Sequence, residues 1–467
     1  MIGNSDIASI SLTEYVARFV NGTKPQDIPG DVIELGKKSI LDGLAVALSG
    51  SIAPPSLIIR DYVSSFGRGG CTAIGASVKL VPRFAALSNG VAMHADDYDD
   101  TLQAETGRYQ GVHVTAPVLS AVLAAAEHRG SSGSEMLTAY HVGVEVAGRI
   151  FDATHINHSL KGFHATATCG MLGAAAAVSR LMGLDVERTR LALGLAGSQA
   201  AGLLDNIGSM TKPFHAGRSA ECAIVANDLV ERGFTASSSI LESPLGFYMA
   251  HGGAHEDARI RGRLGNPWSF ADRGISLKPF PNCALTHPAL SCVCDLVGKE
   301  ALRPDEICRI RIRTSQNIYD TLRNHAPTDE LAAKFSMEFC IATMLHEKKC
   351  SLNEFSQELV NRADIRKTMA LINYKPFDDS EATGYSLNTT FIEIDLMNGK
   401  TMERRADWGK GSKANPMSME EVEVKFLECA QFAQWPVAKS KRAIEAVRRL
   451  EMVRDVKEVT LCLANDR

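Results

Sequence analysis

The chain changes its pattern of apolar and polar positions once along its length and then changes back. From about residue 12 to about residue 254, apolar positions recur every three or four residues in segments rich in Ala and Gly, which predicts helices. Small side chains favour close approach of helix axes, so this part is predicted to be a helical domain. The predicted helices cover residues 32–48, 81–93, 117–128, 134–150, 166–181, 186–204 and 219–232.

A second pattern begins near Pro267, where strand-like alternation appears. Residues 307–313 alternate apolar with basic side chains, which is the period of a β-strand. Residues 389–396 and 401–405 flank Asn398-Gly399, and this pair predicts a hairpin with a type I′ turn. Helices are predicted between the strands, at residues 331–346 and 352–359. This part is therefore predicted to be α+β.

The end of the chain returns to the helical pattern, at residues 422–433 and 438–450, beyond a Gly-rich segment at residues 408–413. A chain of 467 residues is also too long for one ordinary core. We expect a mainly α protein with an α+β insert. The expected helical domain covers residues 1–268 and 414–467, and the expected α+β lid domain covers residues 269–413.

Composition narrows the classes of function. The net charge of -4 argues against a nucleic-acid binder, which would carry a basic surplus. The most apolar stretch, around residues 169–178, is too short to cross a bilayer, and residues 1–6 lack the basic and apolar parts of a signal peptide. The 11 cysteines are scattered and odd in number, which favours a reducing compartment. We therefore expect a cytoplasmic protein with no membrane or nucleic-acid partner.

The acidic run His94-Ala-Asp-Asp-Tyr-Asp-Asp-Thr101 is the strongest sign of a functional site. Four carboxylates at the C-terminal end of a predicted helix face the negative end of its dipole and repel one another. Folding alone gives little reason for them, so we expect a site that uses carboxylates. Asp97 and Thr101 are four residues apart and would share a helical face if the helix continues. The other acids, Asp96, Asp99 and Asp100, are expected to cap the helix, face solvent or support the site from behind.

Two histidines follow glycine-containing segments. His113 lies in a predicted loop before a helix, and His164 opens the helix predicted at residues 166–181. Histidine suits acid–base chemistry because its pKa lies near neutral pH. On spacing alone, a capping role explains His113 as well as a catalytic one, and a structural role is the better explanation of His164.

Two lysines share the context Lys-Pro-Phe. In Met210-Thr-Lys-Pro-Phe-His215, the proline disfavours helix at Lys212, so we expect this lysine in a loop just before a helix N-terminus, where anions are favoured. Lys278-Pro-Phe-Pro-Asn-Cys283 repeats the arrangement at the start of the second domain. Each lysine alone is best explained as a solvated charge. Together they favour a substrate with more than one carboxylate.

Taken together, these motifs resemble those of the MmgE/PrpD family, which includes 2-methylcitrate dehydratase, cis-aconitate decarboxylase and iminodisuccinate epimerase. The resemblance implies a large helical domain and a smaller α+β lid, usually in a homodimer, with the active site between the domains and no metal or organic cofactor. It is carried, in family order, by the acidic run, Gly162-Phe-His164, Met210-Thr-Lys-Pro-Phe-His215, Lys278-Pro-Phe-Pro-Asn-Cys283 with Thr286-His287, and Ala333-Lys-Phe-Ser336.

Two positions depart from the family pattern. The decarboxylase branch has a tyrosine on the helix after the Ala-Lys-Phe-Ser-like motif, and Phe339 matches that position here. The missing hydroxyl argues against cis-aconitate decarboxylation. Residues 102–112 are also longer than the family's usual spacer and lack its common His-Pro, so we expect substrate choice to diverge at this loop.

The resemblance implies roles for individual residues. The expected substrate is a small di- or tricarboxylate held by Lys212 and Lys278, with proton exchange by His164 or His113 at a carbon next to a carboxylate. Lysines or a protonated histidine would stabilise the enolate charge that develops. The expected catalytic residues are His164, His113, Asp97 and Lys212, with Asp97 orienting a histidine. The expected substrate-binding residues are Thr101, Lys278 and His215.

The resulting hypothesis is a cofactor-independent lyase, a dehydratase or a decarboxylase, with an isomerase or epimerase of an amino- or imino-dicarboxylate as the alternative. A rival from another class follows from Asp96-Asp-Tyr-Asp-Asp100, which satisfies the DDxxD pattern of magnesium-dependent prenyl and terpene synthases. An aromatic content of 6% is low for a carbocation pocket. A third reading is a non-catalytic helical scaffold.

Overall fold

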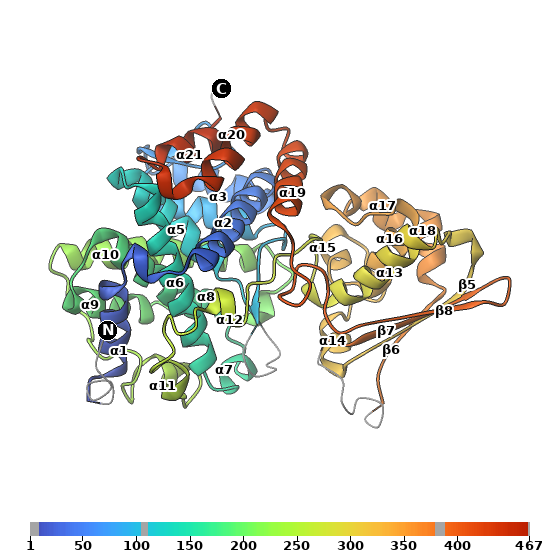
Figure 1. Cartoon of the computed structure of the whole chain (residues 1–467), viewed down its shortest axis with the longest axis horizontal. Helices are drawn as coiled ribbons and strands as arrows, with labels where there is room; N and C mark the ends of the chain where they lie inside the picture. The colour runs from blue at the N-terminus through green and yellow to red at the C-terminus, as the bar shows by residue number, and fades with distance from the viewer. Residues whose placement is uncertain (1–8, 104–110, 379–387, 466–467) are drawn as a thin grey trace. The chain divides into compact units, whose positions relative to one another are not determined.

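The computed structural model describes residues 9–103, 111–378 and 388–465. It divides into two compact units (Figure 1): unit 1 comprises Met1–Leu277 and Ser418–Arg467, and unit 2 comprises Lys278–Met417. Unit 1 is built from helices, whereas unit 2 combines helices with a four-stranded sheet. The predicted fold class, mainly α with an α+β insert, is confirmed.

The core of unit 1 is formed by helices that are rich in small residues. Its long helices are α1 (Leu12–Gly22), α2 (Gly30–Gly50), α3 (Pro54–Ser64), α4 (Pro82–His94), α5 (Thr115–Arg129), α6 (Gly133–Ala153), α8 (Ala165–Met182), α9 (Val186–Gly197), α10 (Thr211–Glu231), α19 (Met419–Phe432) and α20 (Val437–Arg448). Its short elements are α7 (Asn157–Leu160), α11 (Phe247–His251), α12 (Ser269–Asp272), α21 (Lys457–Leu463) and two antiparallel strand pairs, β1 (Cys71–Thr72) with β2 (Lys79–Leu80) and β3 (Leu102–Gln103) with β4 (Gly111–Val112).

Glycine lets two pairs of helices approach closely. A Cβ at Gly173 of α8 would lie 2.5 Å from the Gly143 carbonyl oxygen of α6, and a Cβ at Gly90 of α4 would lie 2.6 Å from the Gly217 Cα of α10. Arg83, near the start of α4, pairs with Glu221 further along α10, so α4 and α10 run antiparallel. This packing brings the last residue of α4 next to the first turn of α10.

Unit 2 contains a sheet of order β6-β5-β7-β8, in which β5 and β6 are parallel and the other neighbours are antiparallel. Its strands are β5 (Ile307–Thr314), β6 (Ile372–Pro376), β7 (Thr390–Leu396) and β8 (Thr401–Ala406). Its helices are α13 (His287–Lys299), α14 (Gln316–Thr321), α15 (Glu330–Ala333), α16 (Met337–Glu347), α17 (Gln357–Asn361) and α18 (Ala363–Met369).

The alternation along β5 has the predicted cause. Ile310 and Ile312 are fully buried in the core of unit 2. Between them, Arg311 faces the other side of the sheet and bonds to Glu393 and Asp395 of β7. One face of this sheet therefore packs against the core, and the other carries cross-strand ion pairs.

Local details differ from the sequence predictions where side chains cap or terminate an element. The predicted helix at residues 331–346 is interrupted, because the Ser336 side chain caps α16 by accepting from the Phe339 amide. The β7–β8 turn is not type I′, which needs two residues with positive φ. Gly399 has a φ of 84°, and Asn398 is not in the positive-φ region.

No single helix among the described residues is long and apolar enough to cross a bilayer. The bent pair α2 and α3 passes the same test only when taken together, with an angle of 84° between the two helices.

Candidate active site

The acidic run leaves the helix at once. The helix α4 ends at His94, and Asp97 has a φ of 53°, a left-handed conformation that aspartate tolerates better than most residues. The chain therefore turns, and Thr101 pairs with Ser276 in an isolated bridge through two backbone hydrogen bonds of 2.9 Å. The prediction that Asp97 and Thr101 share a helical face is wrong for this reason.

The turn directs Asp97 toward a lysine. Nζ of Lys212 donates to Oδ1 of Asp97, and both side chains are 9% exposed. Lys212 is the second residue of α10 and not a loop residue as predicted, because a proline in the first turn of a helix lacks only an N–H that has no partner there. Asp97 is thus paired with Lys212, and its predicted role in orienting or charge-tuning a histidine stays a prediction.

Asp99 is the carboxylate that meets histidines. Nδ1 of His94 lies 2.9 Å from both carboxylate oxygens of Asp99. Nδ1 of His113 lies 3.2 Å from Oδ2 of the same group, in a contact that is less well aligned. Asp99 is fully buried, so of the three roles expected for it, capping the helix, facing solvent or supporting the site from behind, its contacts fit the third. The sequence could have indicated this pair, because His94 and Asp99 lie on either side of the end of the helix.

Burial and charge set the protonation states of this pair. Burial lowers the pKa of His94 to about 4, although Asp99 opposes the shift. Burial alone would raise the pKa of Asp99, but His94 and His113 hold it well below its usual range. At neutral pH we therefore expect a neutral His94 beside an ionised Asp99.

A second imidazole pair lies beside the first. Nδ1 of His164 is 3.1 Å from Nδ1 of His215, and the ring of His164 stacks on that of His94 with centroids 6.1 Å apart. His164 precedes α8 and its amide donates to the Gly202 carbonyl. Burial lowers the pKa of His164 well below its usual value, and His94 and Lys212 add to the shift. The pKa of His215 is lowered by burial and then by Lys212.

The other two acids of the run face away from this cluster. Asp96 accepts a hydrogen bond of 2.8 Å from Ser49, and Asp100 bonds to both the amide and the hydroxyl of Thr115. Each of the four carboxylates therefore has a different partner. A magnesium site of the DDxxD type requires carboxylates that converge on one ion, so the geometry disfavours that rival.

Among the described residues, His94, Asp99 and His113 form the one group of three whose ligand atoms are close enough to hold a metal ion, all within 4.8 Å of one another. Asp99 is hydrogen-bonded to Nδ1 of His94 and lies at ion-pair distance from Nδ1 of His113. We therefore interpret the group as a hydrogen-bonded centre.

Asp100 gives a pH-dependent prediction. Burial raises its pKa to about 8, Thr115 opposes this, and Asp99 and Asp42 add to it. Because the pKa of Asp100 is higher in the folded than in the unfolded protein, protonated Asp100 favours the folded state. This contribution to stability is complete below the unfolded pKa near 4 and is lost as the pH rises toward 8. Asp100→Asn mimics the protonated acid, so its melting temperature should gain on that of the wild type as the pH rises from 5 to 8. The gain corresponds to at most about 1.4 kcal/mol per pH unit.

Thermal unfolding of both proteins from pH 5 to pH 8 measures this effect. The matched control is Asp61→Asn, which neutralises an exposed acid in the same unit and should show no such trend. A constant difference between Asp100→Asn and the wild type across this range would contradict the prediction.

The remaining predicted residues are placed as follows. The hydroxyl of Thr101 is buried without a hydrogen-bond partner among the described residues. Lys278 is the first residue of unit 2 and is 2% exposed there. Phe339 lies in the core of unit 2, with its ring 5.7 Å from that of Phe355. Of the loop expected to set specificity, residues 104–110 lie outside the described part, and its two ends pair as β3 and β4.

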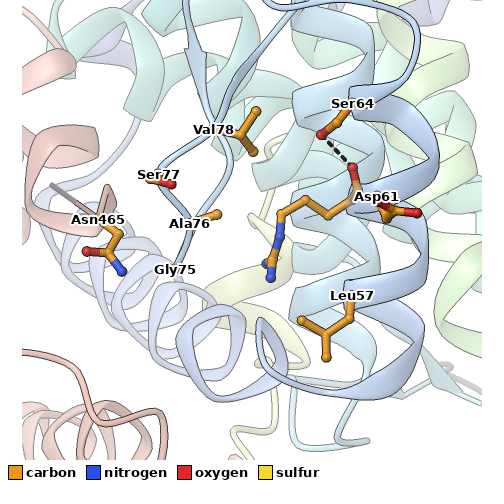
Figure 2. A pocket seen from close by; sticks show the side chains of 9 residues that line it. Leu57, Asp61, Ser64, Gly75, Ala76, Ser77, Val78 and Asn465 are labelled. Atoms are coloured by element: carbon orange, nitrogen blue, oxygen red, sulfur yellow. Dashed lines mark hydrogen bonds between the residues drawn. The ribbon is translucent and has the colours of Figure 1, made fainter. Parts of the chain in front are cut away.

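A separate hollow of unit 1 does not have the chemistry of this cluster. Figure 2 shows α3, with Leu57, Asp61 and Ser64, on one side of this hollow, and the segment at residues 75–78 with Asn465 on the other. Of the described residues that line this hollow, Arg60 is the one cation and none is a histidine. None of the predicted site residues belongs to it.

The fold and the cluster together define a class: a protein with a helical unit that carries buried imidazoles, carboxylates and a lysine, joined to a small α+β unit. The chain belongs to the MmgE/PrpD family. The MmgE/PrpD N-terminal domain matches residues 14–259, and the MmgE/PrpD C-terminal domain matches residues 280–452.

Similar proteins extend over nearly the whole chain. Cis-aconitate decarboxylase of Homo sapiens is 28% identical over 464 residues, covering 97% of this chain and 94% of the relative. The enzyme of the same name from Mus musculus is 29% identical over 430 residues, covering 89% and 86%. That of Aspergillus terreus is 27% identical over 448 residues, covering 91% and 90%.

Proposed function

We propose that this protein is a lyase that acts on a small di- or tricarboxylate by acid–base chemistry at a carbon next to a carboxylate. The observation that carries the proposal is the buried cluster in which the Lys212–Asp97 pair adjoins His164 and His215, near the His94–Asp99–His113 group. Such a cluster combines a cation for an acidic substrate with groups that exchange protons. The named activity of the relatives, decarboxylation of cis-aconitate, is a lyase reaction and supports the class.

Lys212 is proposed to bind a substrate carboxylate. Its ammonium is held in the first turn of α10 by Asp97, and the positive end of the helix dipole lies at the same turn. Asp97 is proposed to present this lysine and to balance its charge before substrate arrives. Thr101, with an unpartnered buried hydroxyl, is proposed to donate to the substrate. Lys278 stays in the proposal as a second carboxylate-binding residue on its motif alone.

His164 and His113 are the proposed proton-exchanging groups. The lowered pKa of His164 keeps it neutral at pH 7 and therefore able to accept a proton. The proton leaves the carbon next to the substrate carboxylate, the electron pair forms an enolate, and Lys212 stabilises the charge. In dehydration, the enolate then expels the hydroxyl of the neighbouring carbon, which takes a proton from the second histidine and leaves as water. In isomerisation, a proton returns to the carbon instead. His215, bonded to His164 through Nδ1, is proposed to fix its orientation and contact the substrate.

Substrate identity is a finer proposal. The missing tyrosine hydroxyl at the position matched by Phe339 favours an acid other than cis-aconitate, such as a citrate-like or methylcitrate-like hydroxy acid. Loss of water from such an acid is also a lyase reaction. An isomerase of an amino- or imino-dicarboxylate is the second candidate, because the same enolate intermediate would be reprotonated without loss of a group.

A panel of citrate, methylcitrate, cis-aconitate and amino-dicarboxylates tests the proposal. A ligand that binds only the native state raises the melting temperature, so one of these acids should raise it and should also be converted. The Lys212→Ala variant, assayed beside the wild type, should lose both effects for that acid. Failure of every acid to bind or react would favour a non-catalytic scaffold.

The proposed chemistry needs no metal or organic cofactor. Activity on the acid identified by the panel should therefore survive dialysis against excess EDTA, with no stimulation by added magnesium. The control is a magnesium-dependent enzyme treated in the same way. Loss of activity that magnesium restores would overturn the metal-free mechanism and revive the DDxxD reading.

A homodimer in the cytoplasm completes the proposal. The family resemblance supports a dimer, and the scattered reduced cysteines support a reducing compartment. Light scattering of the purified protein measures the oligomeric state directly, and a monomer at assay concentration would remove the dimer from the proposal.

A further inference from the structure

One buried carboxylate, that of Asp99, contacts two imidazole rings. Asp99 is fully buried, accepts from His94 at 2.9 Å and lies 3.2 Å from Nδ1 of His113. The two rings meet edge to face, with centroids 4.5 Å apart and an interplanar angle of 62°. Nδ1 of His113 makes no fully aligned hydrogen bond among the described residues, so the 3.2 Å contact with Asp99 is the polar interaction available to it.

The carboxylate dictates the tautomer of both rings. An ionised carboxylate accepts hydrogen bonds and donates none, so each neutral imidazole must present Nδ1–H to it. In both rings, Nε2 is then the atom that gains or loses a proton. In His94 this atom is buried without a partner among the described residues.

Charge balance limits the group to one extra proton. One carboxylate balances one imidazolium, and two imidazolium rings with centroids 4.5 Å apart would repel each other in a buried site. Around the group, the described part of the chain places the Lys212–Asp97 pair and the ring of His164, and burial favours a protonated Asp100. His113, with 12% of its side chain exposed, is more accessible to a proton than His94, which has none exposed.

The backbone of His113 is also held by a hydrogen bond. Its amide donates to the hydroxyl of Thr166 on α8 at 3.1 Å. Two residues later, Thr115 is bonded through its amide and hydroxyl to Asp100, the neighbour of Asp99. Adjacent carboxylates of one loop thus hold the ring of His113 and the segment that follows it.

We propose that Asp99 is a positioning residue that fixes His94 and His113 in the Nδ1–H tautomer, and that this relay carries one exchangeable proton, delivered to substrate from Nε2 of His113. The structural part of the proposal stands on the geometry of unit 1 alone. The consequence for turnover rests on the proposed function. Asp99 acts through the two imidazoles and is not proposed to touch the substrate.

The test uses the whole protein labelled with ¹⁵N-histidine. Thirteen histidines give a spectrum in which His94→Gln and His113→Gln assign the two signals. Both rings of the wild type should show Nδ1–H and an unprotonated Nε2 at pH 8, and the pair should take up one proton in total as the pH falls. In Asp99→Asn, the amide can donate as well as accept, so the rings should lose the single tautomer.

The control is Asp257→Asn, which alters an Asp–His pair with a 2.7 Å contact to His255 outside the cluster. It should leave the spectra of His94 and His113 unchanged. Should Asp99→Asn fail to fold, His94→Gln keeps the proposal testable, because Asp99 would still hold His113 as Nδ1–H. Nε2–H tautomers in the wild type, uptake of two protons by the pair, or an unchanged tautomer in Asp99→Asn would overturn the proposal.

Turnover gives a separate readout. Asp99→Asn should lower kcat by about 10⁴-fold, as expected when a histidine loses the carboxylate that sets its tautomer. KM should change little, and the basic limb of the pH profile, which reports the proton donor, should move to lower pH. Asp257→Asn should match the wild type. An unchanged kcat with the predicted spectra would limit Asp99 to structure and overturn the relay in catalysis. Absence of turnover in the wild type, with the predicted spectra, would overturn only the proposed function.

Discussion

Lys212→Met should abolish turnover of the acid that the panel identifies, with kcat/KM lower by at least about 10³-fold. The ammonium is the proposed site of carboxylate binding and enolate stabilisation, and a charged partner in a buried site has an effect of this size on the transition state. The same change leaves Asp97, 9% exposed, without its cation. Removing one partner of a buried pair costs about 3–5 kcal/mol, so the variant should also be less stable.

The double variant Asp97→Asn with Lys212→Met separates the two effects. Neutralising both partners removes the unpaired charge, so stability should return toward that of the wild type while activity stays absent. Chemical denaturation and the steady-state assay measure the two quantities independently. Activity in the double variant close to that of the wild type would exclude Lys212 from the mechanism.

His164→Gln should lower kcat by about 10²- to 10⁴-fold, the usual range for loss of a general acid or base, with a smaller effect on KM. Glutamine keeps a hydrogen-bonding group of similar reach toward His215 but does not exchange protons at neutral pH. The folded structure should survive, because the backbone amide of residue 164 still bonds to Gly202. Steady-state kinetics with the acid from the panel measure both parameters.

The matched control is His255→Gln, a partly exposed histidine of the same unit that stacks on Tyr248 and lies outside the cluster. It should retain the kinetics of the wild type. If His164→Gln also retained them, His113 would be left as the one proposed proton-exchanging residue. A rise in KM with an unchanged kcat would assign His164 to binding alone.

Periodicity predicted the helices and strands well wherever an amphipathic or alternating pattern ran undisturbed. The strand at β5, with one buried face, follows its predicted range closely. The helices α2, α5 and α8 also follow theirs, although they are buried around most of their circumference. Predictions were wrong where a single side chain or backbone angle decided the outcome. A hydrophobic pattern does not predict such features, which here are the cap at Ser336, the positive φ at Asp97 and the proline in the first turn of α10.

For the candidate site, too, the sequence predicted some features and not others. Motifs identified Asp97, His113, His164, Lys212 and His215 as candidates, and the structure brings these five together in unit 1. Pairing could not be predicted, because it depends on the left-handed turn at Asp97, which sends that acid to Lys212 and leaves Asp99 for the histidines. Four consecutive acids look equivalent in a sequence, whereas burial and partners give each a different environment.

The most direct test of the central claim, that the cluster removes or adds a proton beside a carboxylate and expels a small group, is NMR of the reaction in deuterated water. The wild type should convert one acid of the panel with net loss of water or carbon dioxide, and solvent deuterium should appear at the carbon next to a carboxylate. Both signals should be absent in Lys212→Met. Deuterium exchange or inversion without loss of a group would contradict the lyase and indicate an isomerase, and no change in any acid would contradict the enzymatic account as a whole.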